Sequence, residues 1–285
     1  MENLTDIGAI RELLARHGFH FSKALGQNFL INPSVCPRMA EACGADETTG
    51  ALEIGPGIGV LTRELAKRAG KVASIELDTR LLPILRETLD GFDNVRVIHG
   101  DAMKLDISRL LEEEFPGMPV SVCANLPYYI TSPLLMRLLE SRLPVESITV
   151  LVQKEAAARL CARPGTRECG AVTLAVQYYA EAETLFSVSR GSFLPAPKVD
   201  SAVMRLRVRK APPCAVQDER MLFRLIRAAF GQRRKTLANS LTGAGVAKEK
   251  AGAILEAAGV SPTARAEELS LEAYARLADA ASDIL

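Results

Sequence analysis

The stretch Ala51-Leu52-Glu53-Ile54-Gly55-Pro56-Gly57-Ile58-Gly59 decides the fold. Its first four residues are apolar apart from one glutamate, and such a short run between turn residues predicts a buried strand. The glycines predict a loop, and a helical spacing of apolar residues follows at Leu61, Leu65 and Ala69. A strand, a glycine-rich loop and a helix form the first unit of a nucleotide-binding α/β sheet. We therefore predict an α/β fold.

The glycine spacing restricts the kind of ligand. Gly55, Gly57 and Gly59 form G-x-G-x-G, which differs from the G-x-G-x-x-G of dinucleotide-binding loops and from the P-loop pattern G-x-x-x-x-G-K-[ST]. Glycines allow a tight turn and a close approach of the backbone to a ligand. An acidic residue, Glu53, precedes the loop. A ligand without phosphates, such as S-adenosylmethionine, fits this arrangement better than NAD does.

Two further acidic residues follow predicted strands. Residues 72–75 predict a second strand that ends at Glu76, and residues 95–98 predict a third, shortly before Asp101. Folds of this kind place a carboxylate at about the position of Glu76 to bind ribose hydroxyls. Asp101 is a candidate acceptor for the adenine amine of the ligand. The alternative for each carboxylate is a solvated turn residue with no ligand.

The sequence Asn125-Leu126-Pro127-Tyr128 follows an apolar run at 120–124 that predicts another buried strand. It displays an amide, a backbone carbonyl and an aromatic ring together at the carboxyl end of that strand, where open α/β sheets bind ligands. The Asn125 side-chain oxygen and the Leu126 carbonyl can accept the two N–H groups of an adenine amine, and Tyr128 can stack on the base. The alternative is a strand-to-turn corner with a satisfied asparagine and a packed tyrosine.

These motifs, in this order, resemble the ribosomal RNA adenine dimethyltransferases. The resemblance covers nearly the whole chain and adds three segments to the glycine loop: residues 23–30 (KALGQNFL), 193–201 (FLPAPKVDS) and 232–237 (QRRKTL). The pattern is closest to the small-subunit branch of the family, which is linked to kasugamycin sensitivity. The macrolide-resistance branch usually carries Ile where Leu126 stands and lacks the KALG that precedes Gln27 here.

The resemblance implies a Rossmann-like, S-adenosylmethionine-dependent methyltransferase sheet with helices on both faces, and a small C-terminal all-helical domain. It implies methyl transfer to N6 of two adjacent adenosines in a hairpin loop near the 3′ end of 16S rRNA, within an immature 30S particle. The products are N6,N6-dimethyladenosine and S-adenosylhomocysteine, and no metal is expected. Asn28 and Leu30 would cover the donor, Gly55 would pass beneath its methionine part, and Phe193 would face Tyr128 across the target base.

Three alternatives stay open at this point. The first is a 23S rRNA adenine dimethylase of the macrolide-resistance type. The second is a non-catalytic factor that checks the assembly of small subunits. The third is a methylase of another substrate, although DNA adenine methylases more often carry Asp-Pro-Pro-Tyr, and protein-glutamine methylases Asn-Pro-Pro-Tyr, at the corner.

Composition restricts the class of protein. Of the 285 residues, 48% are hydrophobic, which is enough for a sizeable core, and tryptophan is absent. The six cysteines form no C-x-x-C pair and have no metal-ligand spacing, so we expect reduced thiols. The sequence predicts neither a signal peptide nor a membrane-spanning stretch. We therefore expect a cytoplasmic protein without membrane contact, and a monomer.

Positive charge is concentrated in one part of the chain. The net charge is only +1, yet residues 198–235 hold 11 Lys or Arg and 3 Asp or Glu. Arg220, Arg224 and Arg227 are spaced to share one face of a helix, and three basic residues follow it: Arg233, Arg234 and Lys235. Such a row can neutralise RNA phosphates without reading base sequence. The alternative is an ordinary solvated helix face.

The expected organisation has three parts. Residues 1–32 form a leading helix and the segment that covers the donor, and residues 33–210 form the methyltransferase domain. The prolines of Ala211-Pro212-Pro213 indicate a linker, and residues 211–285 form a helical RNA-binding domain. Helices are expected there at 221–230, 233–241, 248–258 and 270–281.

Overall fold

The computed structural model describes residues 3–22 and 25–285, so Lys23 and Ala24 of the N-terminal motif lie outside the described residues. The chain divides into two compact units. The first extends to Ala157 and includes Glu181–Val208, and the second comprises Ala158–Ala180 and Arg209–Leu285. One division between the units lies near residue 210, and Ala158–Ala180 group with the C-terminal helices. Aromatic packing explains this grouping. The ring centroids of Tyr178 and Tyr179 lie 5.3 and 5.7 Å from the ring centroid of Phe223.

The first unit is built on a sheet whose described strands follow the order β4-β3-β2-β5-β6-β9-β7. Strands β2 to β6 are parallel, and β9 runs antiparallel to β6. The strands are β2 (Gly50–Ile54), β3 (Lys71–Glu76), β4 (Val95–His99), β5 (Val120–Asn125), β6 (Val145–Gln153), β7 (Ala180–Val188) and β9 (Ser201–Val208). The central strands are buried along their length, as a parallel sheet covered on both faces requires.

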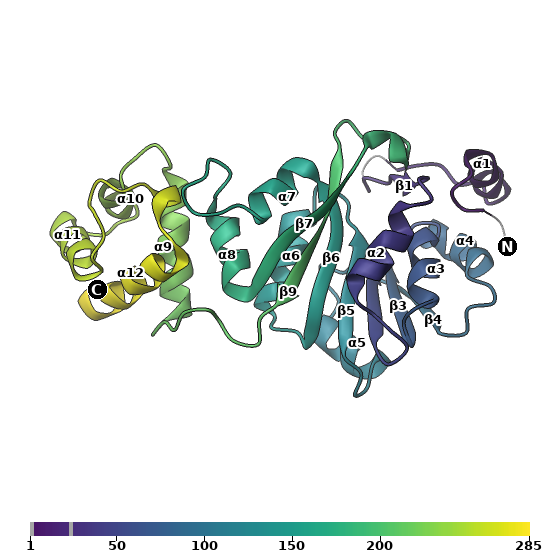
Figure 1. The fold of residues 1–285 in the computed structure, drawn as a ribbon, viewed down its shortest axis with the longest axis horizontal. Helices are drawn as coiled ribbons and strands as arrows, with labels where there is room; N and C mark the ends of the chain where they lie inside the picture. Colours follow the sequence, from purple (N-terminus) through teal and green to yellow (C-terminus); the bar gives the residue numbers. More distant parts are fainter. Residues whose placement is uncertain (1–2, 23–24) are drawn as a thin grey trace. The chain divides into compact units, whose positions relative to one another are not determined.

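Helices cover both faces of this sheet. Right-handed crossovers place helices on opposite faces when the chain moves outward from a central strand in opposite directions. In Figure 1, α2 and α3 lie in front of the strands and α6 lies behind them. The helices of this unit are α1 (Ile7–Arg16), α2 (Val35–Cys43), α3 (Val60–Ala66), α4 (Leu82–Thr88), α5 (Ile107–Glu114) and α6 (Thr131–Glu140). Helix α7 (Lys154–Leu160) continues directly from β6 and crosses the boundary between the units.

A second, two-stranded sheet joins two of the sequence motifs. Strand β1 (Phe29–Leu30) pairs antiparallel with β8 (Phe193–Leu194), with Leu30 opposite Phe193. The N-terminal motif and the FLPAPKVDS motif are thus neighbours, although more than 160 positions separate Phe29 and Phe193 in the sequence. Helix α1 is held to α4 by Arg16 and His17, which both contact the Glu87 carboxylate.

The second unit is helical. It contains α8 (Ala171–Tyr179), α9 (Glu219–Gly231), α10 (Leu237–Gly243), α11 (Lys248–Ala257) and α12 (Leu271–Ile284). The predicted helix at 233–241 begins later, at Leu237, because Thr236 caps it by accepting a hydrogen bond from the Asn239 amide. Arg233, Arg234 and Lys235 therefore lie in a turn. No helix in the described part of the chain is long and apolar enough to cross a membrane.

The strand order locates the binding site. From β2 the chain moves outward through β3 and β4, and it then returns to place β5 and β6 on the other side of β2. The order reverses between β2 and β5, and ligands of open α/β sheets bind outside the carboxyl ends of the strands at such a point.

Candidate active site

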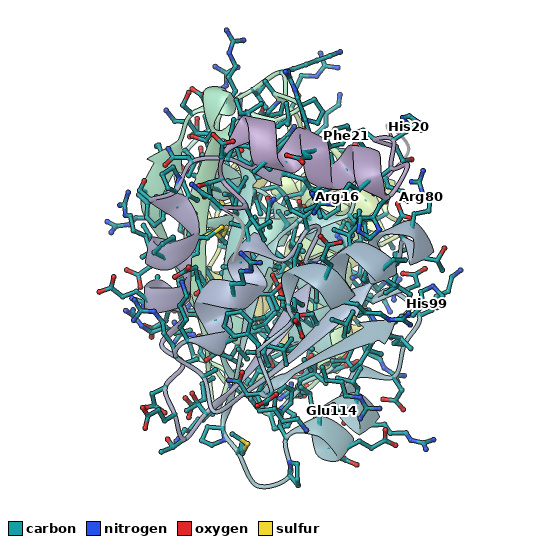
Figure 2. All side chains as sticks on the ribbon, turned by 90° about the vertical axis from the view of Figure 1, so that its right-hand side faces the viewer. Arg16, His20, Phe21, Arg80, His99 and Glu114 are labelled. Atoms are coloured by element: carbon teal, nitrogen blue, oxygen red, sulfur yellow. The ribbon has the colours of Figure 1, made fainter. Side chains whose placement is uncertain are left out.

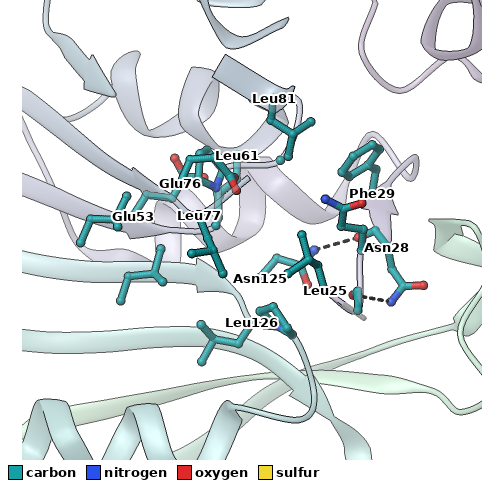
Figure 3. A pocket seen from close by; sticks show the side chains of 18 of the residues that line it. Leu25, Asn28, Phe29, Glu53, Leu61, Glu76, Leu77, Leu81, Asn125 and Leu126 are labelled. Carbon is teal, nitrogen blue, oxygen red and sulfur yellow. Dashed lines mark hydrogen bonds between the residues drawn. The ribbon is translucent and has the colours of Figure 1, made fainter. Parts of the chain in front are cut away.

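A cleft that opens to solvent lies at the carboxyl ends of β2, β3 and β5 (Figure 3). Every sequence-predicted donor ligand and three of the four predicted catalytic residues line it. These are Asn28, Leu30, Glu53, Gly55, Gly57, Glu76, Asp101, Asn125, Leu126 and Tyr128.

The glycine loop forms one wall of the cleft in a conformation that side chains disfavour. Gly55, Gly57 and Gly59 have φ angles of +74°, +60° and +90°, in the left-handed region that glycine adopts at little cost. A Cβ on Gly57 would also come within 3.2 Å of the Phe29 ring. At its glycines the loop therefore presents backbone to the ligand space.

Glu53 is buried at the base of the loop, with 1% of its surface exposed. Its carboxylate accepts hydrogen bonds from Thr62 Oγ1 at 2.6 Å and Ser74 Oγ at 2.7 Å. These bonds connect β2 to α3 and β3. Burial raises the pKa of Glu53 to about 7, although both hydroxyls oppose the shift.

Glu76 ends β3 with 5% of its surface exposed. The Asp78 amide donates to its Oε1 at 2.7 Å. Burial raises the pKa of Glu76 to about 7, and in the described residues no basic side chain forms an ion pair with it. A buried carboxylate that faces a cavity without a cation suits a ligand with hydroxyl donors, such as a ribose. This is the observation by which the cleft fits S-adenosylmethionine.

A clamp centred on Asp78 holds the segment that covers the donor space. Gln27 Nε2 donates to Asp78 Oδ2 at 2.8 Å, and the Arg80 guanidinium reaches both oxygens, at 2.6 and 2.9 Å. The same guanidinium donates to the His20 carbonyl at 3.3 Å; both residues are labelled in Figure 2. Hydrogen bonding from Arg80 lowers the pKa of Asp78. The covering segment is thus fastened two residues beyond Glu76.

Asn125 connects the catalytic corner to the same segment. Its Nδ2 donates to the Asn28 carbonyl at 3.2 Å (Figure 3). This leaves the amide oxygen as the atom that can accept from a substrate. The Leu126 amide donates to the Leu151 carbonyl of β6 at 3.2 Å, so neighbouring backbone fixes the position of Leu126.

Tyr128 is anchored at its hydroxyl, which lies 2.7 Å from Ser201 Oγ at the start of β9. Ser201 is fully buried, and burial raises the pKa of Tyr128. The corner therefore has the satisfied asparagine amide and the packed tyrosine that a purely structural strand-to-turn corner would have. It also presents both residues to the cleft.

Phe193 lies beside the cleft and does not line it. It is 3% exposed and packs in a core with Leu30 and Cys36, which do line the cleft, and it pairs opposite Leu30 in the two-stranded sheet. Its predicted place opposite Tyr128 across the target base stays a prediction. Some lining residues flank predicted ones and were given no role from the sequence. Gln27, Leu77 and Tyr129 are among them.

The predicted RNA-binding residues lie in the second unit and are all exposed. Arg220, Arg224 and Arg227 lie on α9, away from its buried face. Arg233 differs from the others, because its guanidinium donates to the carbonyls of Arg167 and Cys169 at 2.9 and 3.0 Å. It therefore also holds the loop that precedes α8.

Comparison with known proteins decides the family. The model of a family described as ribosomal RNA adenine dimethylase matches residues 18–283. The chain belongs to this family. It is therefore an rRNA adenine dimethyltransferase that uses S-adenosylmethionine, as the sequence predicted.

Curated relatives lie in the small-subunit branch. Proteins named ribosomal RNA small subunit methyltransferase A from Geobacillus sp. (strain WCH70) and Geobacillus thermodenitrificans are 48% and 49% identical to the chain. They match 98% and 96% of it, and 97% and 95% of their own lengths.

Solved structures of the dimethyltransferase family share the fold. The 23S rRNA methyltransferase ErmE is 32% identical with a TM-score of 0.69, and the match covers 90% of this chain and all of that one. A dimethyladenosine transferase from Plasmodium falciparum is 27% identical with a TM-score of 0.74, and the match covers 87% of this chain and 95% of that one. The Rossmann-like methyltransferase fold is thereby confirmed.

Proposed function

We propose that this dimethyltransferase methylates N6 of two adjacent adenosines in a hairpin loop near the 3′ end of 16S rRNA, within an immature 30S particle. The single observation that carries the proposal is the catalytic corner, where Asn125 is held at the carboxyl end of β5 and keeps its amide oxygen for substrate. The identity of 48% to small-subunit relatives supports the choice of RNA.

The cleft residues divide the binding of the donor between them. S-adenosylmethionine, when bound, supplies a methyl group activated by a positively charged sulfur. The Glu76 carboxylate would hold the ribose hydroxyls, and Asp101, at the cleft end of the turn after β4, would accept from the adenine amine. Asn28 and Leu30 would cover the donor, because the Asp78 clamp holds their segment over the cleft. The glycine loop keeps Gly55 close enough to pass under the methionine part.

The corner residues prepare the target amine. The N6 lone pair of adenine is delocalised into the ring, which makes the amine a poor nucleophile. Asn125 Oδ1 and the Leu126 carbonyl would accept its two N–H groups and hold the nitrogen in line with the methyl group. Tyr128 would stack on the base, which is turned out of an unpaired loop. Positioning and preorganised acceptors then carry most of the rate. The methyl group leaves the sulfonium, which becomes S-adenosylhomocysteine. The N6 proton becomes acidic once the methyl group is attached and is released to water, so no general base is needed.

The second unit would bind the RNA backbone. Arg220, Arg224, Arg227, Arg234 and Lys235 are exposed, and they can neutralise phosphates. Arg233 would contribute charge in addition to holding the loop before α8. We also propose that the protein acts as a monomer in the cytoplasm, where small subunits assemble.

The test is methyl transfer from labelled S-adenosylmethionine to two substrates side by side. One is small-subunit particles from a strain that lacks the modification, and the other is large-subunit RNA. We expect label in dimethyladenosine of the small-subunit RNA only. Label confined to large-subunit RNA would make the protein an enzyme of the macrolide-resistance type. Binding of donor and particles without transfer would make it an assembly factor.

A further inference from the structure

The two consecutive tyrosines at the catalytic corner differ in their exposure to solvent. Tyr128 is partly buried and its hydroxyl is bound to Ser201. Tyr129 also lines the cleft, yet it is 57% exposed. Among the described residues, none forms a hydrogen bond with the Tyr129 hydroxyl. The two rings therefore serve one cleft from its interior and from its mouth.

One edge of the Tyr129 ring rests against the segment that covers the donor. Gly26 has a φ of +62°, and a Cβ built on it would lie 3.4 Å from Tyr129 Cε1 and 3.5 Å from Pro127 Cβ. The ring therefore lies beside the Gly26 backbone at this edge, while 57% of the residue stays open to solvent.

An exposed apolar residue needs no explanation in itself, because such residues are common on protein surfaces. Tyr129 is distinctive in two respects. It is the most exposed large hydrophobic residue in the described ranges 3–22 and 25–285, and it stands at the mouth of the cleft. An aromatic ring that faces solvent beside a base-binding site is a stacking platform, because every nucleobase has a π face.

We propose that Tyr129 stacks on the nucleotide next to the adenosine being methylated, an inference that rests on the proposed function. The target base enters the cleft to reach Asn125 and Tyr128, so its neighbour in the strand must stay at the mouth. The ring adjacent in sequence to Tyr128 is placed to receive it. Because the two target adenosines are adjacent, the platform holds one while the cleft holds the other.

The test compares Tyr129→Ala with Tyr129→Phe, which keeps the ring. Initial rates are measured over a range of concentrations of small-subunit particles that lack the modification, and donor affinity is measured separately. Stacking on an aromatic ring contributes about 1–3 kcal/mol per base, which corresponds to roughly 5- to 150-fold in affinity. We expect Tyr129→Ala to raise the KM for particles about tenfold, and Tyr129→Phe to stay within about twofold of wild type. Neither should change donor affinity.

A matched control should show the opposite pattern. Leu77 is 46% exposed, lines the same cleft and follows Glu76. Leu77→Ala should weaken donor binding and leave the KM for particles unchanged. If Tyr129→Ala behaves like Leu77→Ala, the ring serves only to hold the covering segment and the inference is wrong. A wild-type KM in Tyr129→Ala would also overturn it.

A second measurement isolates the neighbouring base. Particles are reconstituted with an abasic nucleotide beside the target adenosine. With these particles the KM of the wild-type protein should rise about tenfold. The KM of Tyr129→Ala should not rise above its value with intact particles. Equal losses in both proteins would contradict the stacking contact. Failure of wild type to methylate unmodified particles would refute the proposed function itself, so the two failures are distinguishable.

Discussion

The cleft and the basic face of α9, which we propose serve one reaction, are built in opposite ways. In the cleft, Glu53 and Glu76 are almost fully buried, and fixed partners hold the side chains of Asn125 and Tyr128. On α9, the side chains of Arg220, Arg224 and Arg227 are exposed. The difference teaches where effects should concentrate. Replacing a cleft side chain that has fixed partners should remove its contribution to the reaction entirely. Each exposed arginine contributes only a small part of the total electrostatic attraction to RNA, which salt screens.

The largest effect should come from Asn125→Ala. Removal of one preorganised hydrogen-bonding group at a reacting centre typically costs about 10²–10³ in kcat. We expect a loss of that size in single-turnover methyl transfer, with donor affinity largely kept. Asn94→Ala is the control, because Asn94 bonds the carbonyls of Ala66 and Ala69 outside the cleft. The control should lower stability and keep the rate. A near-normal rate in Asn125→Ala would remove the residue from the mechanism.

Glu76→Gln should come next, as a loss of donor affinity. Hydrogen bonds to a charged group contribute about 1.5–3 kcal/mol, so we expect roughly 10- to 100-fold weaker binding by calorimetry at pH 8. The pKa of Glu76 in the folded protein is about 7, so the carboxylate forms as the pH rises through that value. Wild-type affinity should therefore increase from pH 6 to pH 8, and the variant should show no such increase.

The control for Glu76 is Glu47→Gln, an exposed carboxylate that does not line the cleft. It should bind donor as wild type does at both pH values. Equal pH dependence in Glu76→Gln and wild type would show that another group controls donor binding.

Glu53→Gln should change stability more than it changes binding. The pKa of Glu53 rises from 4.5 to about 7 on folding, so the folded state holds the proton more tightly and stability falls as pH rises across that window. The substitution should therefore raise Tm more at pH 8 than at pH 5. The corresponding difference in the free energy of unfolding is on the order of 1–3 kcal/mol. Thermal unfolding at the two pH values measures it. The same change in Tm at both would contradict a raised pKa.

The smallest effect per residue should be found on α9. Arg224→Glu with Arg227→Glu should weaken particle binding about tenfold at low salt and reduce the slope of log affinity against log salt by about 2. Lys248→Glu with Lys250→Glu makes an equal charge change on α11 and should alter both quantities less. If the α11 pair has the larger effect, the RNA lies on a different face.

The two regions also differ in how far the sequence predicts them. The glycine loop, Glu76, Asp101 and Asn125 all lie at or just after the carboxyl ends of strands, and parallel strands bring such positions to one edge of the sheet. Local patterns therefore predicted the cleft. The pairing of Phe193 with Leu30 joins segments that are distant in sequence, and no local pattern reveals it.

Long-range contacts account for the other surprises as well. Tyr178 and Tyr179 pack against Phe223, so the segment before β7 belongs with the C-terminal helices. The Arg233 guanidinium donates hydrogen bonds to carbonyls of the loop before α8. Gln27 acts in the cleft through Asp78, which lies 51 positions away. In each case the partner is distant in sequence and carries no recognisable spacing.

The most direct test of this division is the single-turnover rate of methyl transfer at increasing concentrations of unmodified small-subunit particles. It is measured for Asn125→Ala and for the Arg224→Glu, Arg227→Glu pair. We predict that the charge-reversed protein reaches the wild-type rate at saturating particles, because only RNA binding is weakened. Asn125→Ala should stay slow at every concentration. A charge-reversed protein that remains slow at saturation would show that α9 acts in the chemical step and would contradict the division of roles between cleft and basic face.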